Sequence, residues 1–340
     1  MIIFEKAGLL TTVQDLGRTG YQRFGMPVSG VMDAFAMRLA NILVGNKQTE
    51  AVLEITLVGP SIHFEGPGTF AVCGGDFSAR LDGVPIENNR AWSAPAGALL
   101  ELSAARTGAR AYIAFAGGLD IPSVMGSRST CIKAAIGGLN GRAIRRGDRI
   151  GLRVPGKGAG QPARQAPKDF GPAYTAFPEI RFTFGPQDDM FSESGKELFV
   201  REEYVIDLKS DRMGFRLNGP EIERAEGSSG NIISDGVCFG SIQVTNGQPI
   251  VMMADRQTAG GYPKIGCAIS ADLPLLAQLK GGDRVRFCAV SVEQAQEAYI
   301  NQLKQLSELE KSFAKQREYR EQEYLLTVGN KTYTVSIRRT

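Results

Sequence analysis

The chain has 340 residues, of which 43% are hydrophobic and 22% charged, and its formal net charge is +3. A globular protein of this length has room for two domains of roughly 150 residues each. The small net charge, without a cluster of Lys and Arg, argues against nucleic acid as a partner. No apolar run reaches the ~18 residues of a membrane helix, and Glu5 and Lys6 interrupt what would be a signal-peptide core. We therefore expect a cytoplasmic protein with no membrane partner.

The cysteines and the histidine exclude several kinds of site. Five cysteines, an odd number without a CxxC pair, predict reduced thiols rather than a zinc site or a disulfide framework. The one histidine, His63, lies in an apolar strand-like stretch, where we expect an ordinary strand residue. A multi-histidine metal site or a Ser-His-Asp mechanism would depend entirely on it, so we predict no bound metal. The cysteines are Cys73, Cys131, Cys238, Cys267 and Cys288.

Short strands dominate the first part of the sequence. The stretches "LEITLVG", "SIHFEG" and "GTFAVCGG" follow one another between Gly and Pro residues, and the 41 glycines of the chain suit many tight turns. Asp82-Gly83, between alternating residues, predicts a β-hairpin. One helix interrupts the strands at residues 29–46, where apolar residues recur every three or four positions and Ser29 or Gly30 can cap the start.

Three sequence landmarks recur in the same order in the two halves of the chain. They predict a mainly β fold with two duplicated domains, although such phrases also recur by chance in Gly-rich β proteins. Residues 153–178, rich in Pro and Gly, predict a linker, and the "GKGAG" within it lacks the spacing of a phosphate loop. We expect a first β domain at 1–152 and a second at 179–290. The landmark pairs are 57–62 with 217–222, 97–122 with 247–263, and 145–152 with 280–287.

The C-terminal part, 291–340, differs in character. Apolar residues between Val292 and Phe313 recur every three or four positions without Gly or Pro, which predicts a helix of about 30 residues. Its apolar stripe packs on the preceding β domains or, alternatively, forms a seam with a partner or a second copy. The tail alternates around Gly329-Asn330 and predicts a β-hairpin.

Three clusters of polar residues among glycines are candidate binding sites. Asp15, Arg18 and Arg23 precede the helix at 29–46, and arginines near a helix N-terminus suit a carboxylate or phosphate. Gly74-Gly75 before Asp76 permits close backbone approach or, equally well, a bulge. The last has Asp211, Arg212 and Arg216. For the first and last clusters the alternative is a salt bridge that only ties a turn together.

A fourth cluster, "ADRQTAGG" (254–261), ends an apolar strand, where binding residues often collect. Arg256 can bind a carboxylate or phosphate, and Asp255 can act as a base or orient that arginine. Gln257 and Thr258 supply neutral hydrogen bonds. Glycines and a proline also follow the equivalent strand of the first half, "IAFAGGLDIP", but the polar residues do not. The polar residues are therefore the ones that we assign to function.

At these residues the chain resembles a known family. "DLGRTGYQRFGMPVSGVMDAFAMRLANILVGN", "LEITLVGP", "DRMGFRLNGP" and "MADRQTAGGYPKIGCAISADLPLLAQLKGGD" are similar to allophanate hydrolase subunit 2, also called the KipA or biotin-dependent carboxyltransferase family. The resemblance covers residues 1 to about 290. It implies two cyclophilin-like β-barrel domains, here with a short N-terminal and a long C-terminal helix.

The resemblance also implies a function. Members include the C-type subunit of the bacterial ATP-dependent 5-oxoprolinase, which opens a small cyclic amide together with a B-type, KipI-like subunit and an A-type subunit. It implies ATP, with Mg, shared with those partners. The expected catalytic residues are then Asp255, Arg256 and Thr258. The expected substrate-binding residues are Gln257, Gly260, Gly261, Tyr262, Arg18, Asp15 and Arg212.

Two other roles within the family stay open. A KipA-like chain antagonises a KipI-type kinase inhibitor and catalyses nothing. A carboxyltransferase subunit acts on a urea-like amide together with other chains, since this sequence carries no biotin-carrier motif and no biotin carboxylase segment.

Overall fold

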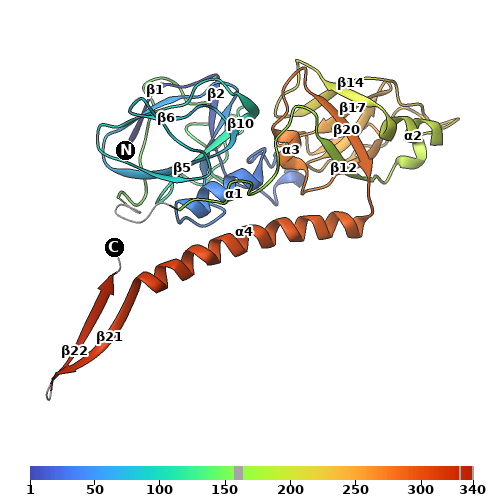
Figure 1. The fold of residues 1–340 in the computed structure, drawn as a ribbon. Helices are drawn as coiled ribbons and strands as arrows, with labels where there is room; N and C mark the ends of the chain where they lie inside the picture. Colours follow the sequence, from blue (N-terminus) through green and yellow to red (C-terminus); the bar gives the residue numbers. More distant parts are fainter. Residues whose placement is uncertain (157–163, 329–330, 339–340) are drawn as a thin grey trace.

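The computed structural model describes residues 1–156, 164–328 and 331–338. Two β domains lie side by side, and helix α4 runs beneath both of them (Figure 1). The predicted mainly β fold is confirmed. Most of the predicted "GKGAG" segment lies outside the described residues.

The first domain encloses its core between two antiparallel sheets, of strand order β11-β1-β4-β9-β6-β7 and β2-β3-β10-β5-β8. The second half of strand β10 is rich in apolar residues because both of its faces are covered. Ile113 and Phe115 point into the core between the sheets, whereas Tyr112 and Ala114 point to the opposite face. The strands are β1 (Ile2–Lys6), β2 (Leu10–Gln14), β3 (Val52–Thr56), β4 (Ser61–Phe64), β5 (Gly68–Asp76), β6 (Arg80–Leu81), β7 (Val84–Pro85), β8 (Ala91–Ala94), β9 (Leu99–Glu101), β10 (Thr107–Phe115) and β11 (Arg149–Ile150).

Two local predictions for this domain are confirmed. Asp82 and Gly83, with φ of 50° and 77°, form the turn of the β6–β7 hairpin. His63 lies on β4, opposite Ile3 of β1 and Leu99 of β9. The Gly74-Gly75 cluster belongs to a register shift between β5 and β10, so the alternative of a bulge is the correct one.

Helix α1 (Ala34–Leu43) covers the outer face of β5 and β10, and its apolar side packs there. It begins later than the sequence predicts. Asp33 is the N-cap, and its Oδ1 accepts a hydrogen bond from Ala36 N at 2.9 Å. Ser29 and Gly30, the predicted caps, instead form a turn with positive φ before the helix. The carboxylate of Asp33 therefore caps the helix in their place.

The second domain is a closed barrel of strand order β12-β19-β16-β17-β14-β13-β20. Its core is aromatic, with the rings of Phe199 and Phe287 stacked at 4.6 Å between centroids. A small sheet, β15 with β18, lies outside the barrel. The strands are β12 (Glu179–Phe184), β13 (Glu203–Ile206), β14 (Gly214–Asn218), β15 (Asp235–Gly236), β16 (Ser241–Thr245), β17 (Gln248–Met252), β18 (Ala259–Gly260), β19 (Lys264–Ala268) and β20 (Arg284–Ala289). The helices are η1 (Gln22–Phe24) in the first domain, and η2 (Asp188–Met190), α2 (Glu193–Arg201) and α3 (Leu273–Ala277) in the second.

The repeated landmarks of the sequence lie next to pairs of neighbouring strands, but they do not occupy the same positions on them, since residues 57–62 follow β3 whereas residues 217–222 begin on β14. In the first domain β3 pairs antiparallel with β10, and in the second β14 pairs antiparallel with β17. The two domains enclose their cores differently. The first domain uses two sheets, whereas the second uses a single closed barrel. Duplication of the domains stays a prediction.

The predicted C-terminal helix and hairpin are both present, as α4 (Val292–Arg320), β21 (Glu321–Val328) and β22 (Lys331–Arg338). Helix α4 packs on the molecule rather than standing free, since Leu306, Leu309 and Phe313 are buried against the cluster of α1. The hairpin projects away from both domains (Figure 1). None of the helices within the described ranges combines the length and the apolar character that crossing a membrane requires.

Candidate functional site

The fourth polar cluster, 254–261, does not form one surface. Strand β17 ends at Met252, and the chain then turns, with Asp255 N donating to Arg212 O at 2.7 Å and Arg256 N to Met253 O at 3.2 Å. This turn sends consecutive side chains in different directions. Asp255 points into the contact between the domains, Arg256 into a pocket, and Thr258 into a separate open cleft.

Arg212 and Asp255 join the two domains. The Arg212 guanidinium donates to Asp255 Oδ2 at 2.8 Å, to Gly30 O at 2.6 Å and to Glu54 Oε1 on β3. Glu54 in turn accepts from Met32 N at 2.7 Å. Burial opposes the charge of Arg212, but the two carboxylates outweigh it and raise the pKa of that guanidinium. We call Glu54, Arg212 and Asp255 the interdomain triad.

The interdomain triad uses up the hydrogen-bonding groups that the sequence assigned to a ligand. All three nitrogens of the Arg212 guanidinium already donate within the chain. The geometry therefore assigns Arg212 and Asp255 to domain docking, and the predicted substrate contact through Arg212 does not fit it. The alternative predicted for the third cluster, a salt bridge within its own loop, does not describe Arg212 either, because its partners are Glu54 and Asp255. Removing one member of such a buried network is costly, because it leaves an uncompensated charge.

A second buried polar contact lies beside the triad. Gln278 accepts hydrogen bonds from Ala109 N at 3.0 Å and Arg110 N at 2.9 Å, and donates to Asp33 Oδ2 at 3.0 Å. Burial raises the pKa of Asp33, against the hydrogen bonds from Ala36 N, Gln278 and Tyr174. The contact between the domains is thus built largely from matched polar groups.

We expect Gln278→Ala to lower the free energy of unfolding by about 1–3 kcal/mol, because buried donors and an acceptor lose their partner. Urea denaturation of the purified chain measures this. Gln305→Ala is the matched control, since Gln305 is exposed on α4 and should change stability by less than about 0.5 kcal/mol. Equal stability of the two variants would contradict the role of Gln278.

The first polar cluster also has a structural role. Asp15 Oδ1 accepts hydrogen bonds from the hydroxyls of Ser127 and Ser129, both at 2.6 Å, and Oδ2 accepts from Arg128 N at 2.6 Å. Arg18 is 1% exposed and donates to Ser129 O at 2.5 Å. Asp15 thus holds the chain at residues 127–129, 112 positions away at Ser127, and does not merely tie its own turn together as the predicted alternative has it. Neither residue lines the pocket of Arg256.

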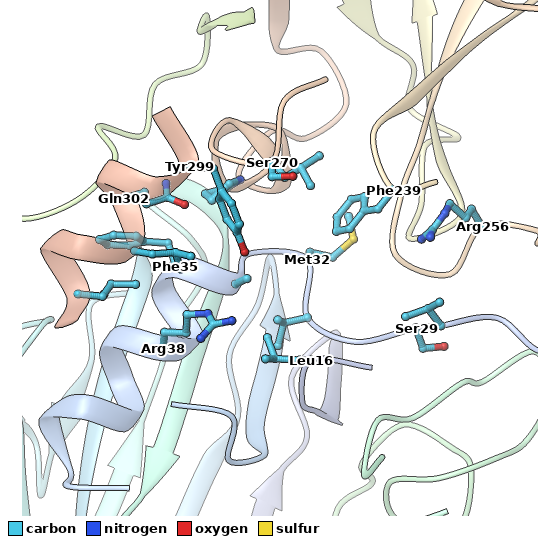
Figure 2. Close-up of a pocket in the computed structure, with 17 residues that line it drawn as sticks. Leu16, Ser29, Met32, Phe35, Arg38, Phe239, Arg256, Ser270, Tyr299 and Gln302 are labelled. Carbon is cyan, nitrogen blue, oxygen red and sulfur yellow. The ribbon is translucent and has the colours of Figure 1, made fainter. Parts of the chain in front are cut away.

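Arg256 lines a pocket of about 190 Å³ where three parts of the chain meet. Figure 2 shows Phe35 and Arg38 of α1 with Tyr299 and Gln302 of α4 at the left, and Phe239 and Arg256 at the right. Met32 lies next to Phe239, and Ser29 lies below Arg256. Its remaining lining is mostly apolar. A mostly apolar pocket with a few polar groups, at a domain junction, is the usual setting of a small-molecule site.

Arg256 is a buried arginine without a paired carboxylate among the described residues, and the nearest groups that can carry negative charge are Cys238, Cys267 and Asp255. Its Nε donates to Val237 O at 3.0 Å and its guanidinium lies 5.8 Å from the centroid of the Phe239 ring. Within the described chain, no carboxylate lies within 4.0 Å of its nitrogens, and burial lowers its pKa. Ser29 adds a buried hydroxyl that has no hydrogen-bond partner among the described residues. These features make the pocket a candidate site for a small anion.

A larger open cleft of about 740 Å³ lies between η1 and the barrel edge. Thr258 lines it together with Arg23 and Lys264, whose ammonium pairs with Asp235 at 3.0 Å. Cys238 and Cys267 also line this cleft, with their sulfurs 3.4 Å apart. The cysteines are free thiols as predicted, but their separation in the sequence concealed this contact.

The remaining predicted residues, which follow Arg256 in the chain, are not among those that line the cleft. Gln257 is exposed and donates to Gln243 Oε1 at 3.5 Å. Gly260 pairs with Asp235, and a Cβ on it would lie 2.5 Å from Gln243 Nε2, the end of a side chain that can move. Gly261 has room for a Cβ, and Tyr262 is 42% exposed. Sequence reasoning missed Ser29, Phe239 and the residues of α4, which no local motif marks.

Comparison with known proteins identifies the family to which this chain belongs. Residues 24–289 match the model of the carboxyltransferase domain, subdomain A and B. The chain belongs to this carboxyltransferase family. The resemblance predicted from the sequence motifs is thereby confirmed. The pocket of Arg256 combines residues of the matched region with residues of α4, which begins after it.

Relatives of this carboxyltransferase family member differ in length. It is 39% identical to the C-type subunit of 5-oxoprolinase of Escherichia coli, over 91% of this chain and 97% of that one. It is 34% identical to the C-type subunit of 5-oxoprolinase of Haemophilus influenzae, over 87% of this chain and 95% of that one. The structure of Kluyveromyces lactis urea carboxylase superposes with a TM-score of 0.85 at 33% identity, over 91% of this chain but 29% of that one. The chain thus spans under a third of that urea enzyme.

Proposed function

We propose that the chain is the C-type subunit of an ATP-dependent 5-oxoprolinase. In this proposal it acts with a B-type, KipI-like subunit and an A-type subunit, and converts 5-oxo-L-proline, ATP and water to L-glutamate, ADP and phosphate. The observation that carries the proposal is the end-to-end match to the E. coli 5-oxoprolinase chain, which covers 97% of that chain. A match of this extent leaves no additional domain of the relative unaccounted for.

The pocket of Arg256 suits such a substrate. 5-Oxoproline is a small ring with one carboxylate and one amide. A buried guanidinium that has no paired carboxylate among the described residues can bind the substrate carboxylate, and the unpartnered hydroxyl of Ser29 can hydrogen-bond the amide. The volume of about 190 Å³ is below the ~300 Å³ at which ordinary ligand pockets begin, which favours a compact substrate over a nucleotide.

ATP and its Mg²⁺ are assigned to a site shared with the partner subunits. On this chain the open cleft offers Arg23 and Lys264, and cationic groups of this kind fit phosphate oxygens. Bound there, ATP would supply the phosphoryl group that activates the amide oxygen for hydrolysis. Thr258 at the same cleft supplies a hydroxyl for positioning.

The test is reconstitution. The chain is co-expressed with its A-type and B-type partners, the complex is purified, and ATP hydrolysis is measured with and without 5-oxoproline. The proposal expects hydrolysis that depends on 5-oxoproline and is lost when this chain is omitted. A well-folded three-subunit complex without such hydrolysis would refute it.

A second candidate is a carboxyltransferase subunit that acts on a urea-like amide. The specific observation in its favour is the TM-score of 0.85 to a urea carboxylase structure. Supplying a carboxylated biotin carrier and urea to the same complex tests it, with carboxyl transfer as the readout. Binding to a KipI-type partner without turnover of either substrate would instead favour the non-catalytic, KipA-like role.

A further inference from the structure

Cys238 and Cys267 meet although 28 residues separate them in the chain. Cys238 lies in the loop between β15 and β16, and Cys267 lies on β19 beside β16. The loop is fixed by Ser241, whose Oγ accepts from Cys238 N at 3.1 Å and whose N donates to Cys238 O at 3.2 Å. The sulfur atoms are 3.4 Å apart, so the fold itself holds two thiols in contact.

The two thiols have different surroundings. Cys238 is exposed at the open cleft, whereas Cys267 is partly buried beneath it. The hydrogen bond from the Cys267 thiol, helped by Ser241 Oγ at 3.0 Å and by the charge of Arg256, holds the pKa of Cys238 well below its usual value. The same hydrogen bond, with burial, raises the pKa of Cys267. One thiol is therefore accessible with a lowered pKa, and the other is less accessible with a raised pKa.

We propose that Cys238 and Cys267 form an oxidant-reactive dithiol, which a hydroperoxide converts into an intramolecular disulfide. Cys238 is the attacking thiol because it is exposed, and Cys267 is the resolving thiol because its sulfur lies in contact. The sulfurs need to approach by a little over 1 Å to reach the ~2.05 Å of a disulfide. Cys238 lies in a loop and not within a strand. The loop ends at Gly240, which has a φ of 91°.

The chemistry balances with hydrogen peroxide as the oxidant. The Cys238 thiolate attacks one peroxide oxygen, so that an S–O bond forms, the O–O bond breaks, and the departing hydroxide takes up a proton to become water. Cys267 loses its proton and attacks the Cys238 sulfur, forming the S–S bond and releasing the second oxygen as water. Two thiols are oxidised, and one peroxide is reduced to two waters.

The disulfide would also affect the candidate substrate pocket. It ties down the loop that contains Val237, whose carbonyl accepts the hydrogen bond from Arg256 Nε. Oxidation is then expected to change 5-oxoproline turnover. This consequence rests on the proposed function, whereas formation of the disulfide does not.

The test uses the purified, reduced full chain and hydrogen peroxide, without any partner or activity assay. Free thiols are counted over time, and the linked peptides are identified by mass spectrometry. We expect loss of two thiols, a single link between Cys238 and Cys267, and recovery of both thiols with a dithiol reductant. Oxidation of these cysteines at the rate of Cys288, without the link, would overturn the proposal.

Variants separate the two roles. Cys267→Ser should stop at a sulfenic acid on Cys238, which dimedone traps, and Cys238→Ser should remove the fast reaction. Cys288→Ser is the matched control, because Cys288 is partly exposed on β20 and outside the pair, and it should leave the link unchanged. Equal trapping of Cys238 in the wild type and in Cys267→Ser would overturn the resolving role.

The pH dependence of the alkylation rate tests the lowered pKa of Cys238. Two thiols that are only in structural contact would not change this dependence. At pH 6, iodoacetamide should modify Cys238 at least about tenfold faster than Cys288, because a lowered pKa leaves more thiolate at that pH. The difference should shrink towards pH 9, where ordinary thiols also ionise. A Cys238 rate that rises with pH in parallel with that of Cys288 would contradict the ionised thiolate.

Discussion

Replacing Arg256 by alanine will lower kcat/KM for 5-oxoproline-dependent ATP hydrolysis by about 30-fold to several thousand-fold. The range corresponds to the ~2–5 kcal/mol that removing one partner of a buried charge pair costs. The effect follows from the position of Arg256, a buried cation in a small pocket with no carboxylate of the described chain beside it. The measurement is steady-state kinetics of the reconstituted complex.

Two variants make this prediction specific. Arg256→Lys keeps the charge but loses the planar fork, so we expect an intermediate loss. Arg216→Ala removes an exposed arginine of β14 and should leave kcat/KM unchanged. Melting temperatures of all three proteins separate a catalytic loss from unfolding. Wild-type turnover in a folded Arg256→Ala complex would refute the assignment.

Replacing Arg212 by alanine will lower the free energy of unfolding by about 3–5 kcal/mol. The variant leaves Glu54 and Asp255 as buried or partly buried carboxylates without their cation, and the cost of an uncompensated buried charge is of this size. Chemical denaturation of the isolated chain gives the value. Arg216→Ala, four residues away and exposed, should change it by less than about 0.5 kcal/mol.

A double-mutant cycle tests whether the interdomain triad acts as a unit. Glu54→Ala alone should also destabilise, since Arg212 and Met32 N lose their acceptor. The double variant should cost much less than the sum of the two single variants, because the groups share one network. Additive losses would show that Glu54 and Arg212 are energetically independent.

Local sequence signals predicted the elements but not the directions of the site residues. The Asp82-Gly83 turn and helix α4 depend on backbone preferences and on periodicity over neighbouring residues, and both were predicted correctly. The residues of cluster 254–261 were predicted to act together because they are adjacent in sequence. The chain turns after β17, and adjacent side chains enter different environments there.

The contacts that sequence reasoning missed join distant parts of the chain. Arg212 meets Glu54 across 158 positions, and the thiols of Cys238 and Cys267 meet because β16 and β19 pair in one particular register. Docking of two domains and strand register are set by the whole core rather than by a local motif. For this reason Arg256, which has no carboxylate partner in the described chain, and the fully paired Arg212 look alike in the sequence.

Helix α4 forms one wall of the pocket, and this wall can differ between proteins that share the two β domains. Tyr299, Gln302 and Leu303 line the pocket, yet α4 begins at Val292, beyond the family region that ends at residue 289. A graft of a different helix after β20 would alter the shape of the cavity while keeping both β domains and Arg256. On the proposed function, such a graft would change substrate choice without rebuilding the barrel that carries Arg256.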